Sequence, residues 1–172
     1  MVAHFLTRFL KDVPQEFSFS AASWKGRLHP GTTAGLSGLI EHEYITAEIA
    51  VKICKILGRE DLIDQAILAV VAHDTYKSAW PTDEGTFQWA RYNPSHGQLA
   101  AARLKQTHQS LLAQEQKVLD PILPEVNQAV SEHMSIFNQP EPTPLIPEDP
   151  VLKYVVVLSD MLASRKYFHV KH

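Results

Sequence analysis

The amino-acid sequence predicts an all-α protein that folds as one compact helical bundle. Three observations support this fold class: apolar residues recur at three- and four-residue steps, prolines separate the resulting segments, and strand signals are almost absent. The chain has 172 residues, of which 45% are hydrophobic and 20% charged, an ordinary globular composition. A chain of this length buries roughly two thirds of its unfolded surface in one core. We therefore expect a single domain over residues 1–172.

The periodicity predicts five helices, and the first two lie close together in the sequence. The first runs from Gly38 to Leu57, and Gly58 supplies a stop. The second can be capped by Asp61 and is expected to end near Lys77.

The other three helices are expected from His96 to about Gln106, after Pro124, and from Pro150 to Ala163. Ser95 can cap the first of these. The segment VLKYVVVLSD is β-branched and could form a strand, but it has no partner strand elsewhere and continues into MLASRK, so we expect a helix. The proline-rich stretch 140–150 is expected to be an extended surface connection.

Several protein classes are excluded by simple features. No apolar run approaches the ~18 to 20 residues of a membrane span, and the N-terminal segment has the pattern of an amphipathic start rather than a secretion signal. Cys54 is the only cysteine, so it cannot form an internal disulfide or a thiolate cluster, and we expect it in the core of a cytoplasmic protein. The net charge of −3 and the absence of a basic stripe argue against a dedicated nucleic-acid binder.

The adjacent residues His73 and Asp74 lie at the end of the apolar segment AILAVVAHDTYK. A buried helix normally excludes a charged aspartate beside a histidine unless another group compensates their desolvation. A divalent cation does this, because imidazole nitrogens and carboxylate oxygens are its natural ligands. His42 lies in the preceding helix, and Asp160 is a lone carboxylate in the apolar run VVVLSDMLAS. A bundle can pack these three helices around one point, which predicts a metal site.

The order H…HD…D, with the His-Asp pair closing an apolar helix, resembles the HD superfamily of metal phosphohydrolases. Lys77 also matches, because the family often has HDxxK at this place. The resemblance covers about residues 22–166 and implies a helical bundle of the HD-domain type. It implies that a first divalent metal ion is bound by His42, His73, Asp74 and Asp160.

Two further histidines extend this resemblance to branches of the superfamily that bind a second metal. His96 opens the third helix, and His133 lies at a helix end in QAVSEHMSIF. By resemblance, His96 and His133 would bind the second ion and share Asp74 with the first. From the residues alone, His96 is also compatible with a solvated helix start and His133 with a boundary position. We expect one or two divalent ions, with Mn, Fe, Co, Ni, Zn and Mg all open.

An upstream segment, AASWKGRLHPGTTAGLSGLIEH, is similar to HD-type 3′→5′ exoribonucleases and relaxase-type HD domains. The matching positions are Ala21–Ala22, His29, Gly38, Leu39, Glu41 and His42. The chain departs from that pattern because Pro30 stands where a second histidine is usual and the spacing before Gly38 is enlarged. His29 is therefore a candidate substrate-binding residue or a plain loop residue.

The expected reaction is hydrolysis of a phosphoester by a metal-bound hydroxide, with Lys77 and Asp74 as the catalytic residues. Lys77, with Arg27 or Lys25, could neutralise charge on the phosphoryl group, although each is also compatible with a solvated role. Four aromatic residues lie in loops flanking the site motifs, where one could stack a base, although packing in the core or as a lid is the more usual role: Trp24, Trp80, Trp89 and Tyr92.

The residues leave three functional hypotheses. The first is a phosphodiesterase or nucleotidase acting on mononucleotides or short oligonucleotides, favoured by the acidic balance. The second is a 3′→5′ single-strand nuclease, in which case long nucleic acid would be the substrate. The third is a non-enzyme that uses the HD fold and its metal for structure or ligand sensing. The sequence does not predict an oligomeric state.

Overall fold

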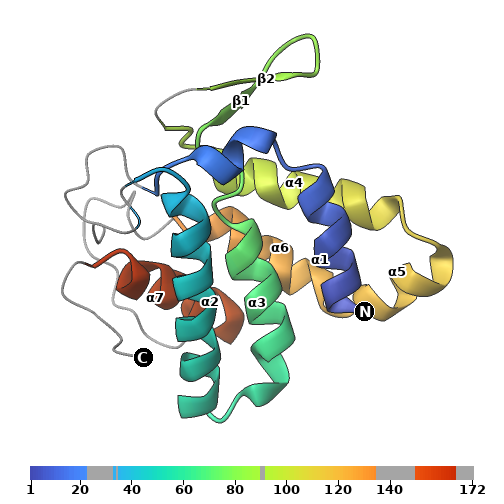
Figure 1. The fold of residues 1–172 in the computed structure, drawn as a ribbon. Helices are drawn as coiled ribbons and strands as arrows, with labels where there is room; N and C mark the ends of the chain where they lie inside the picture. The colour runs from blue at the N-terminus through green and yellow to red at the C-terminus, as the bar shows by residue number, and fades with distance from the viewer. Residues whose placement is uncertain (23–32, 34, 90–91, 135–149, 166–172) are drawn as a thin grey trace.

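Helices α2 (Gly38–Ile56) and α3 (Ile63–Ala72) run antiparallel through the middle of the structure (Figure 1). The structure is a computed structural model, and it describes residues 1–22, 33, 35–89, 92–134 and 150–165. A 3-10 turn, Glu60–Leu62, connects the two helices. Helix α7 (Val151–Ala163) packs against both of them. The all-α fold class is confirmed.

Helices α4 (His96–Gln109) and α6 (Leu123–Glu132) form a second packed pair. α6 also contacts α3 and α7, so it joins this pair to the central helices. The N-terminal helix α1 (Val2–Lys11), which is not among the five predicted helices, packs on α3 and α4 with the rings of Phe5 and Phe9 fully buried. The 3-10 segment Gln15–Phe19 contacts α2, and the short helix α5 (Ala113–Leu119) contacts α4.

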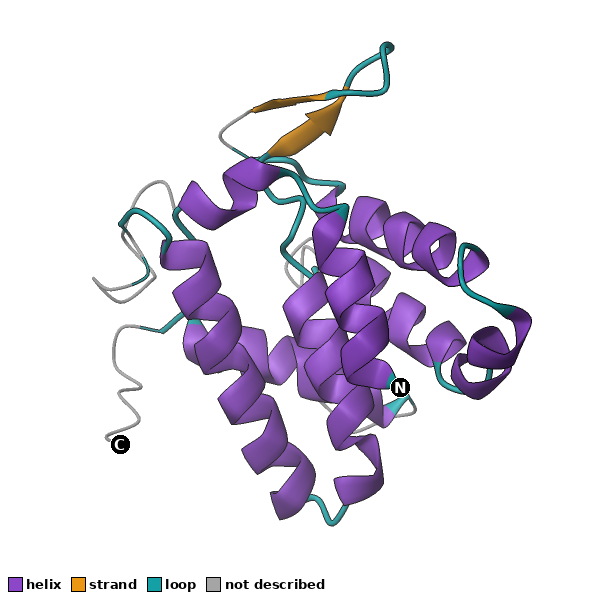
Figure 2. Cartoon of the chain, turned by 45° about the vertical axis from the view of Figure 1, so that its right-hand side comes forward, coloured by secondary structure: helices purple, strands orange, loops and turns teal. Residues whose placement is uncertain are grey.

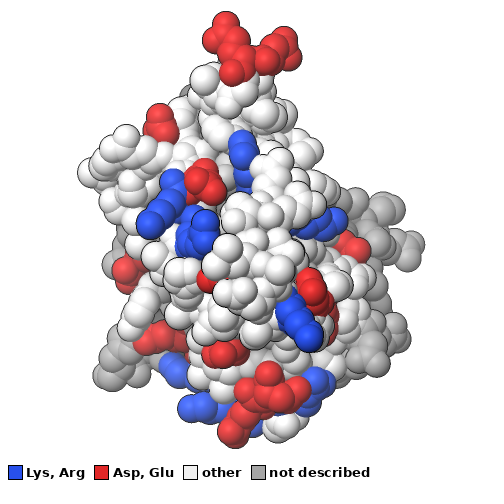
Figure 3. Space-filling view, turned by 90° about the vertical axis from the view of Figure 1, so that its right-hand side faces the viewer, with Lys and Arg blue, Asp and Glu red and all other residues white. Residues whose placement is uncertain are grey.

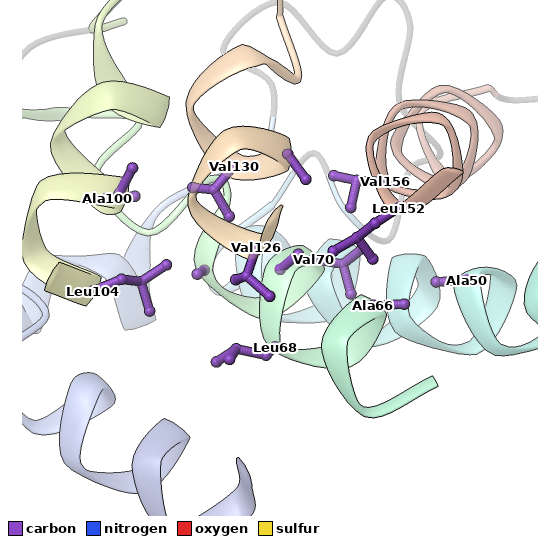
Figure 4. Packing of buried hydrophobic residues seen from close by; sticks show 14 of the residues in the cluster. Ala50, Ala66, Leu68, Val70, Ala100, Leu104, Val126, Val130, Leu152 and Val156 are labelled. Atoms are coloured by element: carbon purple, nitrogen blue, oxygen red, sulfur yellow. The ribbon is translucent and has the colours of Figure 1, made fainter. Parts of the chain in front are cut away.

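Leucine, valine and alanine side chains from α2, α3, α4, α6 and α7 meet in one core (Figure 4). Val70 of α3 and Val126 and Val130 of α6 are fully buried in it. Cys54 is also fully buried, as expected, and burial raises the pKa of its thiol. The helices meeting at this core also carry the site residues described below, so the packing that buries apolar surface also positions those residues.

A small antiparallel hairpin projects beyond the helices (Figure 2), and the sequence analysis did not predict it. It consists of β1 (Ala79–Pro81) and β2 (Phe87–Trp89). The Thr82 amide donates to the Thr86 carbonyl oxygen at 2.8 Å, which closes the turn between the strands. Gly85 lies in this turn with a φ of 75°, a left-handed conformation that glycine adopts most easily. Strands of three residues are too short to produce a detectable alternation of polar and apolar residues, which explains the omission.

Both ends of α3 differ from the expected ones. α3 ends at Ala72 rather than near Lys77, because the side chains of His73 and Thr75 bond to the carbonyl oxygens of Val70 and Ala72 that a continuing helix would use. Asp61 does not cap α3; it lies in the preceding 3-10 turn and accepts two hydrogen bonds from Arg59.

The later helices agree more closely with expectation. α4 begins at His96 as predicted but continues to Gln109, and the side chain of Ser95 does not cap it. α6 begins one residue before Pro124, and Pro150 is the N-cap of α7, whose β-branched sequence is helical as expected. Residues 140–149, expected to be extended, lie outside the described part of the chain.

Candidate metal centre

Six histidine and aspartate side chains from five helices meet inside the bundle. They are the six metal ligands predicted from the sequence, and each is at most 7% exposed. They are His42 on α2, His73 and Asp74 directly after α3, His96 at the start of α4, His133 directly after α6, and Asp160 on α7.

One group of side chains surrounds the Nε2 atom of His73. His42 Nε2 lies 3.0 Å from Asp160 Oδ1. His73 Nε2 lies 3.7 Å from the same oxygen and 3.8 Å from Asp74 Oδ2, and it is buried without a hydrogen-bond partner among the described residues. The ligand atoms of His42, His73 and Asp160 are close enough together to hold a metal ion. Together with Asp74, these three residues are the predicted first-metal set.

A second group lies at the other oxygen of Asp74. Asp74 Oδ1 is 2.9 Å from His96 Nε2 and 3.6 Å from His133 Nε2. His73, Asp74 and His133 form another set whose ligand atoms are close enough to hold a metal ion. Asp74 therefore turns Oδ2 toward His73 and Oδ1 toward His96 and His133, so one carboxylate joins the two groups.

Backbone carbonyl groups orient three of the four imidazole rings in the same way. The Nδ1 atoms of His73, His96 and His133 lie 2.6, 2.6 and 2.7 Å from the carbonyl oxygen three residues earlier in each case. A carbonyl oxygen only accepts, so Nδ1 carries the hydrogen, and in the neutral ring the lone pair is on Nε2. Such second contacts are typical of metal-binding histidines, because they fix the tautomer and the ring plane.

The histidine pair at the second group fits a bound cation. His96 Nε2 and His133 Nε2 are 3.0 Å apart, and each is the nitrogen that carries the lone pair in the neutral ring. Burial lowers the pKa of His133, which favours its neutral form. Two lone pairs face each other at this distance only with a positive charge, a proton or a metal ion, between them. A metal at the usual distance of about 2.1 Å from each nitrogen satisfies both.

The charges of the cluster are strongly coupled. Burial opposes ionisation of Asp74, yet Lys77 and His73 hold the pKa of its carboxyl well below the usual value. Burial also opposes ionisation of Asp160, but His42 and His73 hold the pKa of its carboxyl well below the usual value. Burial would lower the pKa of His73, but Glu43 and Asp74 outweigh it and raise that pKa well above the ordinary value. The ionised carboxylates therefore draw positive charge into the centre.

Close helix packing at Gly97 brings His96 and His133 together. A Cβ atom at Gly97 would lie 2.6 Å from the carbonyl oxygen of Val130 and 3.1 Å from the ring of His133. Any larger residue would push the start of α4 away from the end of α6. Gly97 therefore permits the short separation between the two imidazole rings.

The loop before α4 is fixed by Asn93, a residue that the sequence analysis did not single out. Its side chain donates to the Ala79 carbonyl at 2.6 Å and accepts from the Ser95 amide at 2.9 Å, while its carbonyl accepts from His96. Asn93 thus forms a turn that leads into α4, and the helix has no side-chain cap. The dipeptide Asn93–Pro94 is a turn signal that could have identified it.

The predicted catalytic and substrate-binding residues are only partly described. Lys77 lies at the edge of the centre, where its ammonium group pairs with Asp74 Oδ2 and its side chain is 20% exposed. Burial lowers its pKa, but Asp74 and Asp160 outweigh burial and raise it. Lys25, Arg27 and His29 lie outside the described residues, so their predicted contact with substrate stays a prediction.

Comparisons with known proteins give no relative for this chain. No family model, curated protein or solved structure matches it. Among the described residues, no helix is both long and apolar enough to cross a membrane.

Proposed function

We propose that the chain is an HD-type, divalent-metal-dependent phosphohydrolase that cleaves phosphoester bonds in nucleotides or short oligonucleotides. The observation that carries this proposal is the position of Asp74, whose Oδ2 faces His73 while its Oδ1 faces His96 and His133. A carboxylate shared between two imidazole-rich groups suits a pair of divalent cations. The order of the ligands along the chain supports the HD-type assignment.

Each residue of the centre has a part in this chemistry. His42, His73, Asp74 and Asp160 would hold the first ion, and His96 and His133, with Asp74, the second. Divalent ions supply Lewis acidity and lower the pKa of a coordinated water, which gives a nucleophile near neutral pH. The Lys77 ammonium, held at Asp74 Oδ2 and partly exposed, would neutralise charge on a phosphoryl oxygen at the edge of the site.

Two features favour small substrates with an aromatic base. The face in Figure 3 has lysine and arginine interspersed with aspartate and glutamate rather than a basic stripe, in agreement with the net charge of −3. Tyr92 is 43% exposed, and its ring packs edge-on against that of His96 with centroids 5.7 Å apart. An exposed aromatic ring beside the metal ligands offers a surface on which a nucleobase can stack.

The first experiment measures hydrolysis of a mononucleotide, a dinucleotide and a 20-mer by untagged protein with Mn²⁺, Co²⁺ or Zn²⁺, at two salt concentrations. We expect turnover that a chelator abolishes, a weak dependence on length, and a salt slope corresponding to about one to three phosphates. A strong preference for the 20-mer with a steep slope would identify the nuclease instead. Absence of turnover on these substrates and on bis-p-nitrophenyl phosphate, despite bound metal, would leave the non-enzyme hypothesis.

Substitution of Tyr92 tests the proposed nucleobase contact. Tyr92→Ala is expected to raise KM for a mononucleotide by about 10-fold, because stacking on an aromatic ring contributes about 1–3 kcal/mol. Tyr92→Phe keeps the ring and should leave KM nearly unchanged. Steady-state kinetics on a sugar phosphate without a base provides the control, since its KM should not respond to either substitution. Equal effects of Tyr92→Ala on both substrates would contradict base stacking.

A further inference from the structure

Glu43 is a buried carboxylate that the proposed chemistry does not use. It follows His42 on α2, and its residue is only 4% exposed. Leu39, Glu43, Thr46 and Ala50 follow the helical spacing and are all buried. Glu43 therefore occupies an interior position of α2 where an apolar side chain would normally pack, and its charge calls for a physical reason.

The surroundings of Glu43 make that charge costly. Neither carboxylate oxygen has a hydrogen-bond partner among the described residues. A buried carboxylate is stable only when hydrogen bonds or positive charge compensate its lost hydration. The compensation must then be electrostatic, and it comes from the side of His73, whose Nδ1 lies 3.3 Å from Glu43 Oε2.

Glu43 lies directly behind the imidazole of His73. Its Oε2 is 3.3 Å from His73 Nδ1, whose hydrogen goes to the Val70 carbonyl at 2.6 Å. On the opposite side of the ring, His73 Nε2 faces Asp74 and Asp160. The His73 ring therefore lies between the Glu43 carboxylate and the metal centre. Because the ring separates them, Glu43 would act on the centre through His73 and not by contacting substrate on that side.

We propose that Glu43 is a positioning residue that strengthens metal binding through His73. Its negative charge, 3.3 Å from Nδ1, increases the electron density at Nε2 and so the affinity of the ring for a cation, while the Val70 carbonyl fixes the ring plane. It also adds a third buried carboxylate to Asp74 and Asp160, which favours divalent cations in the centre. The inference rests on the metal centre of the proposed function.

The test is a Co²⁺ titration of the full, untagged, metal-stripped chain, followed by calorimetry and by the visible absorption of the bound ion. Glu43→Gln keeps the shape and removes the charge, so it should weaken Co²⁺ affinity about 10–100-fold while leaving the number of ions bound at saturation unchanged. Thr46→Val, an isosteric change at a buried residue one turn along α2, should bind as the wild type does.

Three outcomes would overturn the inference while leaving the proposed function intact. These are wild-type affinity in Glu43→Gln, an equal loss in Thr46→Val, or, where Glu43→Gln does not fold, wild-type affinity in Glu43→Asp, whose carboxylate is withdrawn by one methylene. A wild-type chain that binds no Co²⁺ would instead remove the metal centre, and with it the proposed function. The two failures are therefore distinguishable.

Discussion

Under the proposed function, Asp74→Asn is expected to lower kcat/KM for phosphodiester hydrolysis by about 10²–10⁴-fold, because metal ions contribute several kcal/mol to such transition states. Asp74 offers one oxygen to His73 and the other to His96 and His133, so both groups lose their shared anionic ligand. Asparagine has the same shape but presents one neutral oxygen and an amide. Steady-state kinetics and elemental analysis measure the loss of activity and of both ions together.

Two further variants test whether the loss is specific to the carboxylate of Asp74. Asp64 is an exposed carboxylate on α3, and Asp64→Asn should leave activity and metal content unchanged. His133→Ala removes a ligand from one group only, so metal content should fall from two ions per chain toward one. Retention of two ions and full activity in Asp74→Asn would contradict the shared-carboxylate arrangement.

Part of the histidine and aspartate cluster was predictable because His73, Asp74 and Asp160 are polar residues in segments where helical periodicity favours apolar ones. His96 and His133 were predicted only through the resemblance to two-metal branches of the HD superfamily. Asp160 interrupts VVVLSDMLAS, and His73 and Asp74 close AILAVVAHDTYK. Periodicity also predicted α2 and α7 to within one or two residues, since long helices with a continuous apolar face give the strongest signal.

Other features required the structure. Glu43 stands in the polar sequence IEHEY, where a surface carboxylate is the usual interpretation, and only the packing of α2 shows that it is buried. The early end of α3 depends on hydrogen bonds made by the side chains of His73 and Thr75, which a periodicity analysis does not include. The role of Gly97 depends on the approach of two helices far apart in the sequence, which no local pattern encodes.

Removal of the proposed metal ions is expected to lower the melting temperature by about 5–10 °C. An ion present at 100 times its Kd adds about 2.7 kcal/mol to the free energy of unfolding, and the melting temperature of a chain of this size shifts by about 2–4 °C per kcal/mol.

The pH dependence of this effect follows from His73. Without metal, a proton on His73 can replace the missing positive charge, since the carboxylates raise its pKa well above the ordinary value. A raised folded-state pKa adds stability that is fully present below the unfolded pKa of about 6.5 and is lost as the pH rises through the folded pKa. The metal-free protein should therefore become less stable above about pH 6.5, and chelation should have a larger effect at pH 8 than at pH 6. Thermal unfolding with and without chelator measures this, and Asp74→Asn is the control that should not respond. A chelator effect that shrinks as the pH rises would contradict this account of the centre.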